Sequence, residues 1–177
     1  VIAGDPSATD DVTLRRAVVV GAGAMGGLAT ANLVREGITE LVVVNRTVAN
    51  AEHLAGNVAA NHGIDVRGVG LDDLASVMAD ADVVVAATGS VGSVVGVGEV
   101  HSALAARTSS TPLVICDLGL PRNVDPAASR LPGVHVVDIE SLRDDSAAQA
   151  AENDALAARS IVAKELADYL TSQRQAE

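Results

Sequence analysis

The amino-acid sequence predicts an α/β fold, a doubly wound parallel sheet with helices on both faces. Six short apolar runs, rich in valine and mostly unbroken, alternate with stretches of helical periodicity. Unbroken apolar runs are typical of strands that are buried on both faces, as in parallel sheets. A glycine-rich turn directly after the first run is a second indication, and it favours the strand order 3-2-1-4-5-6.

The expected strands and helices alternate along the chain. The strands are residues 17–20, 41–44, 65–69, 83–87, 113–116 and 134–137. The first helix follows the glycines and ends at Gly37, and the second is capped by Thr47 and ends between Gly56 and Gly63. Shorter helices are expected over residues 71–78 and 100–106, so that each helix connects two strands.

Composition and charge limit the class of protein. The core must be aliphatic, because the 177 residues include no Trp, no Phe and a single tyrosine. The net charge of −11, from 23 acidic and 12 basic side chains, repels the phosphates of nucleic acids. No apolar run reaches the roughly 18 residues of a membrane span. We expect a cytoplasmic protein that by itself binds neither nucleic acid nor membrane.

No complete catalytic or metal-binding constellation is evident. The one cysteine, Cys116, excludes an internal disulfide and lies inside an apolar run. A buried structural thiol is expected there rather than a nucleophile, which needs exposed, electropositive surroundings. The four histidines lack metal-ligand spacing, and the only lysine, Lys164, is expected to be solvated. We therefore predict no catalytic residue and no metal site.

The segment GAGAMG carries the clearest functional signal, because it follows a predicted strand and opens a predicted helix. Gly21 permits a tight turn, Gly23 lets the backbone approach a pyrophosphate, and Gly26 allows close packing of helix on strand. The N–H groups at the helix start bind the anion. The alternative is a glycine turn that serves packing alone. The predicted cofactor contacts are Gly21, Ala22, Gly23, Ala24, Met25 and Gly26.

The second predicted strand ends at Asn45-Arg46-Thr47, where many dinucleotide-binding proteins have an acidic residue on the ribose. The planar guanidinium of Arg46 suits phosphate oxygens, and Thr47 adds a hydroxyl at a second helix start. Asn45 can hold the ribose without adding negative charge. These three residues predict NADPH rather than NADH, the alternative being a helix cap beside a surface arginine.

Two further segments are expected at the same edge of the sheet. Thr88-Gly89-Ser90 ends the strand next to the first, where small residues leave room for the nicotinamide half, although a plain tight turn is the alternative. Asp117 to Asn123 follows the fifth strand, and Gly119 within it is a predicted cofactor contact. Asp117 and Arg122 could orient the cofactor or pair with one another.

Three regions are expected along the chain. Residues 1–13 are polar and predict a linker or tail, and residues 14–145 predict one NADP-binding Rossmann domain. Residues 146–177 predict a long helix, since apolar residues recur at helical spacing from Ala151 to Leu170. The apolar stripe of this helix packs back on the sheet or serves another domain or a partner chain. Because the first residue is Val1, we expect the chain to be part of a longer protein.

Several segments together resemble the glutamyl-tRNA reductase family. They are RRAVVVGAGAMGGLATANL, VVVNRT, AATGS, CDLGLPRNVDP and LPGVHVVDIESL, followed by the alanine-rich terminal segment. The glycine motif and NRT also occur in shikimate dehydrogenases, whereas PRNVDP, DIESL and the terminal segment are more specific. The resemblance runs from about Leu14 to Gln175. Gly119 is often alanine in that family.

The resemblance implies an NADPH-dependent oxidoreductase of tetrapyrrole (porphyrin) biosynthesis, of which this chain is the central NADPH domain with part of a spinal helix. In that family an N-terminal domain takes the glutamyl group from its tRNA as a cysteine thioester, and NADPH reduces it to glutamate-1-semialdehyde. Cys116 does not match that cysteine. Contact with glutamyl-tRNA is thus expected only through the N-terminal domain, and a homodimer through a C-terminal domain.

Two alternatives remain open from the residues. One is a shikimate-dehydrogenase-like NADP domain, in which PRNVDP and the long helix have no obvious place. The other is a non-catalytic NADP-binding or interaction module, in which the acidic terminal helix recruits a partner.

Overall fold

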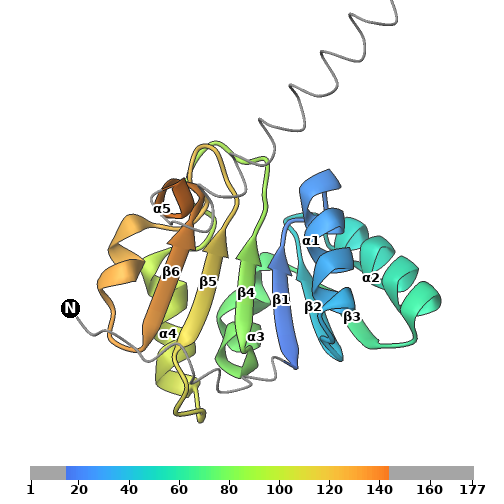
Figure 1. Cartoon of the computed structure of the whole chain (residues 1–177), viewed down its shortest axis with the longest axis horizontal. Coiled ribbons are helices and arrows are strands. Elements are labelled where there is room, and N and C mark those ends of the chain that lie inside the picture. The colour runs from blue at the N-terminus through green and yellow to red at the C-terminus, as the bar shows by residue number, and fades with distance from the viewer. Residues whose placement is uncertain (1–14, 144–177) are drawn as a thin grey trace, which may run out of the picture. The chain divides into compact units, whose positions relative to one another are not determined.

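The computed structural model describes residues 15–143 and contains one six-stranded sheet in the order β3-β2-β1-β4-β5-β6 (Figure 1). All paired strands are parallel, which confirms the predicted doubly wound, Rossmann-like fold. The strands are β1 Arg16–Val20, β2 Glu40–Val44, β3 Asp65–Val69, β4 Val83–Ala86, β5 Leu113–Asp117 and β6 Val134–Asp138.

Helices cover the two faces of the sheet in pairs. The first pair is α1 (Ala24–Arg35) and α2 (Val48–His62), and the second is α3 (Leu74–Asp80) and α4 (Val97–Ala106). Short 3-10 helices, η1 (Leu71–Asp73) and η2 (Pro126–Arg130), complete the connections.

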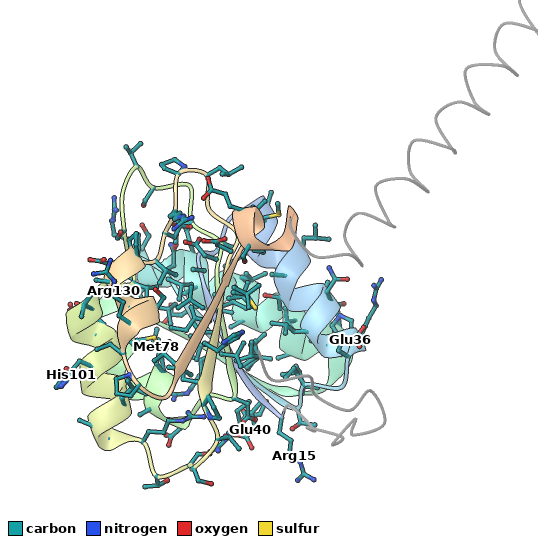
Figure 2. All side chains as sticks on the ribbon, turned by 60° about the vertical axis from the view of Figure 1, so that its left-hand side comes forward. Arg15, Glu36, Glu40, Met78, His101 and Arg130 are labelled. Carbon is teal, nitrogen blue, oxygen red and sulfur yellow. The ribbon has the colours of Figure 1, made fainter. Side chains whose placement is uncertain are left out.

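The core is aliphatic, and its two layers follow from the alternation of side chains along each strand. In β1, Val19 packs with the α1 and α2 layer, whereas Val18 and Val20 pack with the α3 and α4 layer. Met78 on α3 is fully buried in the second layer, while His101 on α4 lies at the surface (Figure 2). All four histidines are exposed, as their scattered spacing suggested.

The predicted elements agree with the structure apart from their ends. Residues 71–78 were expected to form one helix, but they divide into η1 and the start of α3. Gly37 and Gly63 follow α1 and α2 with positive φ angles of 93° and 67°, as expected of glycines that end helices. The short helix η2 was not predicted.

The chain divides into two compact units, the first ending at Asp138 and the second starting at Ile139. Of the second unit the structure describes α5 (Ile139–Arg143). The predicted tail at residues 1–13 and the predicted long helix at 146–177 lie outside the described residues. Within residues 15–143, no helix has the length and apolar character needed to cross a lipid bilayer.

Candidate functional site

A cavity of about 240 Å³ opens at the carboxyl ends of β1, β2 and β4. Three predicted segments line it together: Gly21 to Gly23, Asn45 to Thr47, and Thr88 to Ser90. Its remaining walls are Val20, Val44, Leu71, Ala87 and Val94. In open α/β sheets this edge, where the strand order reverses, is the usual place of ligands.

The glycine turn has the geometry expected of a dinucleotide fingerprint. Gly21 has φ of 116°, and a Cβ there would lie 2.4 Å from the carbonyl oxygen of Ala87. A Cβ on Gly26 would lie 1.9 Å from the carbonyl oxygen of Gly21, so only glycine lets α1 start this close to β1. A Cβ on Gly23 would meet nothing within 4 Å, so its backbone can be approached from the cavity.

The first turn of α1 has no side-chain cap. Gly23 is the N-cap residue, and the first turn contains no acidic side chain. Ala24 and Met25 begin the helix, and Met25 is half exposed. Backbone N–H groups at such a helix start attract an anion. Gly26 is buried and supports the turn without lining the cavity.

Asn45 ties the end of β2 to the glycine turn. Its Oδ1 accepts a hydrogen bond from the backbone N of Ala22 at 3.4 Å, and its Nδ2 donates to the carbonyl oxygen of Thr47 at 3.0 Å. An amide has one further N–H and further acceptor capacity, which suits the predicted ribose contact.

Arg46 and Thr47 bring positive potential to the cavity. Arg46 is exposed, and its Nη2 donates to the hydroxyl of Ser90 at 3.3 Å. Thr47 is the N-cap residue of α2, as predicted, but its hydroxyl makes no capping hydrogen bond. The first turn of α2 lacks acidic side chains, so its N–H groups and the Thr47 hydroxyl suit an anion.

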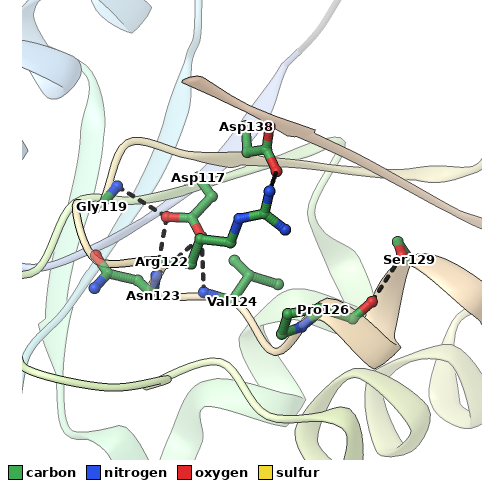
Figure 3. A network of polar contacts seen from close by, with 8 residues as sticks. All are labelled: Asp117, Gly119, Arg122, Asn123, Val124, Pro126, Ser129 and Asp138. Carbon is green, nitrogen blue, oxygen red and sulfur yellow. Dashed lines mark hydrogen bonds and ion pairs between the residues drawn. The ribbon is translucent and has the colours of Figure 1, made fainter. Parts of the chain in front are cut away.

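Asp117 organises the turn after β5 (Figure 3). This carboxylate is buried and accepts hydrogen bonds from the backbone N–H groups of Gly119, Asn123 and Val124, at 2.9 to 3.1 Å. Arg122 forms an ion pair with Asp138, 3.0 Å from Nη2 to Oδ2. Asp117 therefore supports the backbone of this turn, a role that the sequence did not suggest.

Asn123 joins this turn to the Thr88 segment. Its Oδ1 accepts from the backbone N of Thr88 at 2.8 Å, and its carbonyl oxygen accepts from the N–H groups of Val94 and Val95. Within the described residues its Nδ2 has no acceptor, although the side chain is fully buried. The sequence does not single out this residue, because only the fold places its amide beside Thr88.

Gly119 does not line the cavity, although it was predicted as a cofactor contact. A Cβ at this position would lie 2.5 to 2.8 Å from the side-chain amide atoms of Asn123. In the structure this glycine makes room for Asn123.

The geometry of the glycine turn, Arg46 and the two helix starts supports binding of an anionic, extended ligand.

Burial raises the pKa of the Cys116 thiol, which keeps it protonated at neutral pH and fits the predicted structural role. Over residues 15–143, no three His, Cys, Asp or Glu side chains are arranged to hold a metal ion.

Comparison with known proteins gives the family. The sequence profile of shikimate/quinate 5-dehydrogenases matches residues 6–144. The chain belongs to the shikimate/quinate 5-dehydrogenase family. The chain is therefore similar to oxidoreductases that contain a domain for binding a nicotinamide cofactor.

Among solved structures, the chain is similar to glutamyl-tRNA reductase from Methanopyrus kandleri, with 34% identity over 74% of this chain and a TM-score of 0.64. It is also similar to quinate dehydrogenase from Corynebacterium glutamicum in complex with NAD, with 25% identity over 70% and a TM-score of 0.54. A shikimate dehydrogenase in complex with NADP+ shares the fold at 19% identity over 74% and a TM-score of 0.53. The chain spans 31%, 43% and 45% of these three proteins.

Proposed function

We propose that the chain is the NADPH-binding domain of a glutamyl-tRNA reductase. The observation that carries the cofactor assignment is the meeting of Arg46 and Thr47 with the glycine turn around one cavity. Two groups suited to phosphate, a guanidinium and an uncapped helix start, lie on the side where β2 ends.

Each part of the cavity has a proposed role. Gly21, Gly23 and the start of α1 bind the pyrophosphate, Asn45 contacts the ribose, and Arg46 with Thr47 binds the 2′-phosphate. Thr88 and Gly89 hold the nicotinamide half, and Ser90 holds the Arg46 side chain. The cofactor supplies a hydride, and the chain's own residues bind and orient it.

The choice of reaction is supported by two observations. The segments PRNVDP and DIESL resemble glutamyl-tRNA reductases, and the Methanopyrus protein shares 34% identity with this chain. The proposed reduction of a glutamyl thioester to glutamate-1-semialdehyde needs further domains, with a nucleophile other than Cys116. We propose residues 14–145 as the cofactor domain and 146–177 as the connection to a dimerisation domain.

A shikimate- or quinate-dehydrogenase-like NADP domain is the second candidate, favoured by the family profile over residues 6–144. The coding sequence around this domain distinguishes the two candidates. An upstream coding region for a cysteine-bearing domain, beside genes of tetrapyrrole synthesis, supports the first candidate, and a region for a shikimate-type substrate domain supports the second.

Calorimetric titration of the chain with NADPH and NADH tests the cofactor assignment. Arg46→Ala is expected to weaken NADPH binding about tenfold or more, because a charge-assisted contact with the phosphate is lost. NADH binding should change less than about fivefold, since an exposed hydrogen bond contributes little. Arg35→Ala, at the far end of α1, changes the net charge equally and should leave both affinities unchanged. Equal affinity of the unmodified chain for both cofactors would contradict the assignment.

A further inference from the structure

The hydrogen bond between Arg46 and Ser90 joins two loops that are not neighbours in the sheet. Arg46 follows β2, Ser90 follows β4, and β1 lies between these two strands. Adjacent strands are about 4.8 Å apart, so the two strand ends are separated by about 10 Å. The hydrogen bond, here called the Arg46–Ser90 bridge, therefore spans the carboxyl end of β1, where the glycine turn begins.

Ser90 is held on the buried network of the neighbouring turn. Its backbone N donates to the hydroxyl of Thr88 at 3.4 Å, and the backbone N of Thr88 donates to Asn123. Val94 and Val95, beyond Ser90, also donate to Asn123. One buried residue thus anchors the loop on both sides of Ser90, which makes the serine a fixed acceptor for the longer arginine side chain.

The bridge crosses the space that a dinucleotide needs. A pyrophosphate bound at Gly23 lies over the end of β1, with its two nucleosides toward β2 and β4. Arg46 and Ser90 both line the cavity, so the hydrogen bond between them lies across its opening. The arginine must therefore move when a dinucleotide binds.

We infer that Ser90 is an affinity-setting residue, because it holds Arg46 in a position that closes the cofactor site. This inference rests on the proposed dinucleotide binding and extends it. Any dinucleotide must break the Arg46–Ser90 bridge, so the bridge lowers the affinity for NADPH and NADH by the same factor. The released guanidinium then pairs with a 2′-phosphate, which NADPH has and NADH lacks.

The test is calorimetric titration of the full chain and its variants with NADPH and NADH. Ser90→Ala is expected to tighten binding of both cofactors by the same factor, about two- to fivefold, as fits the loss of one exposed hydrogen bond. Ser90→Thr keeps the hydroxyl and should bind like the unmodified chain. In an Arg46→Ala background, Ser90→Ala should have no effect, because the bridge is already absent.

Three results would overturn the inference: unchanged affinities in Ser90→Ala, weaker binding of both cofactors, or tightening that persists without Arg46. Weaker binding would make Ser90 a direct cofactor contact. Thermal melting of each variant separates these effects from loss of folding. A different result contradicts the proposed function: Arg46→Ala leaves the ratio of the NADPH and NADH affinities unchanged. If no variant binds either nucleotide, both proposals fail.

Discussion

The turn at Gly21–Gly26 and the turn at Asp117–Val124 both follow buried strands at the same edge of the sheet, but different interactions hold their backbones. The first depends on missing side chains, because a Cβ on Gly21 or Gly26 would collide with backbone. The second depends on a buried carboxylate that accepts three backbone N–H groups. Steric fit shapes the site at the end of β1, and a polar network shapes the turn after β5.

This difference has a consequence for mutational sensitivity. The glycine turn should tolerate changes of charge, but it has no room for an added side-chain atom at Gly21 or Gly26. A polar network tolerates small changes of shape but not the loss of its acceptor, because several buried donors then lose their partner together. Three substitutions separate the two modes.

The largest expected effect is that of Asp117→Ala. Loss of the carboxylate leaves three N–H groups without their acceptor and should lower the free energy of unfolding by about 3 kcal/mol or more. The matched control is Asp125→Ala, which removes an exposed cap of η2 and should cost about 1 kcal/mol. Urea denaturation measures both. Similar losses in the two variants would show that the Asp117 network adds no special stability.

Gly26→Ala should have the next largest effect. The added methyl group collides with the carbonyl of Gly21, and we expect a loss of about 2 kcal/mol in stability together with weaker binding of both cofactors. Gly27→Ala is the control, because its Cβ meets only a leucine side chain at 4.0 Å. A helix-interior alanine should there raise stability by about 0.5–1 kcal/mol. The steric account is wrong if the two variants behave alike.

Gly119→Ala should have the smallest effect, a loss of about 1 kcal/mol from the close approach to Asn123. The double variant with Asn123→Ala removes the group that the new methyl meets. In a double-mutant cycle, the penalty of Gly119→Ala should therefore disappear. A penalty that is unchanged without the Asn123 amide would place the cost in the backbone at position 119 instead.

Much of the site at the ends of β1 and β2 was predictable because its signals are local. Gly21, Gly23 and Gly26 belong to one turn, and Arg46 and Thr47 follow one strand, so spacing alone predicts their positions. The loops after β4 and β5 depend on contacts between residues that are far apart in the sequence. Asn123 contacts Thr88, 35 positions earlier, and Gly119 accommodates that amide instead of lining the cavity.

The sequence by itself determined the parallel sheet, its strand order and the glycine turn, because apolar periodicity and glycine spacing act within a few residues. Only the tertiary structure decided that Asp117 binds backbone N–H groups, that Asn123 joins two loops, and that Arg46 reaches Ser90. Those side chains can adopt many rotamers and partners in an isolated segment. Their partners are determined when β1, β2, β4 and β5 pack into one sheet.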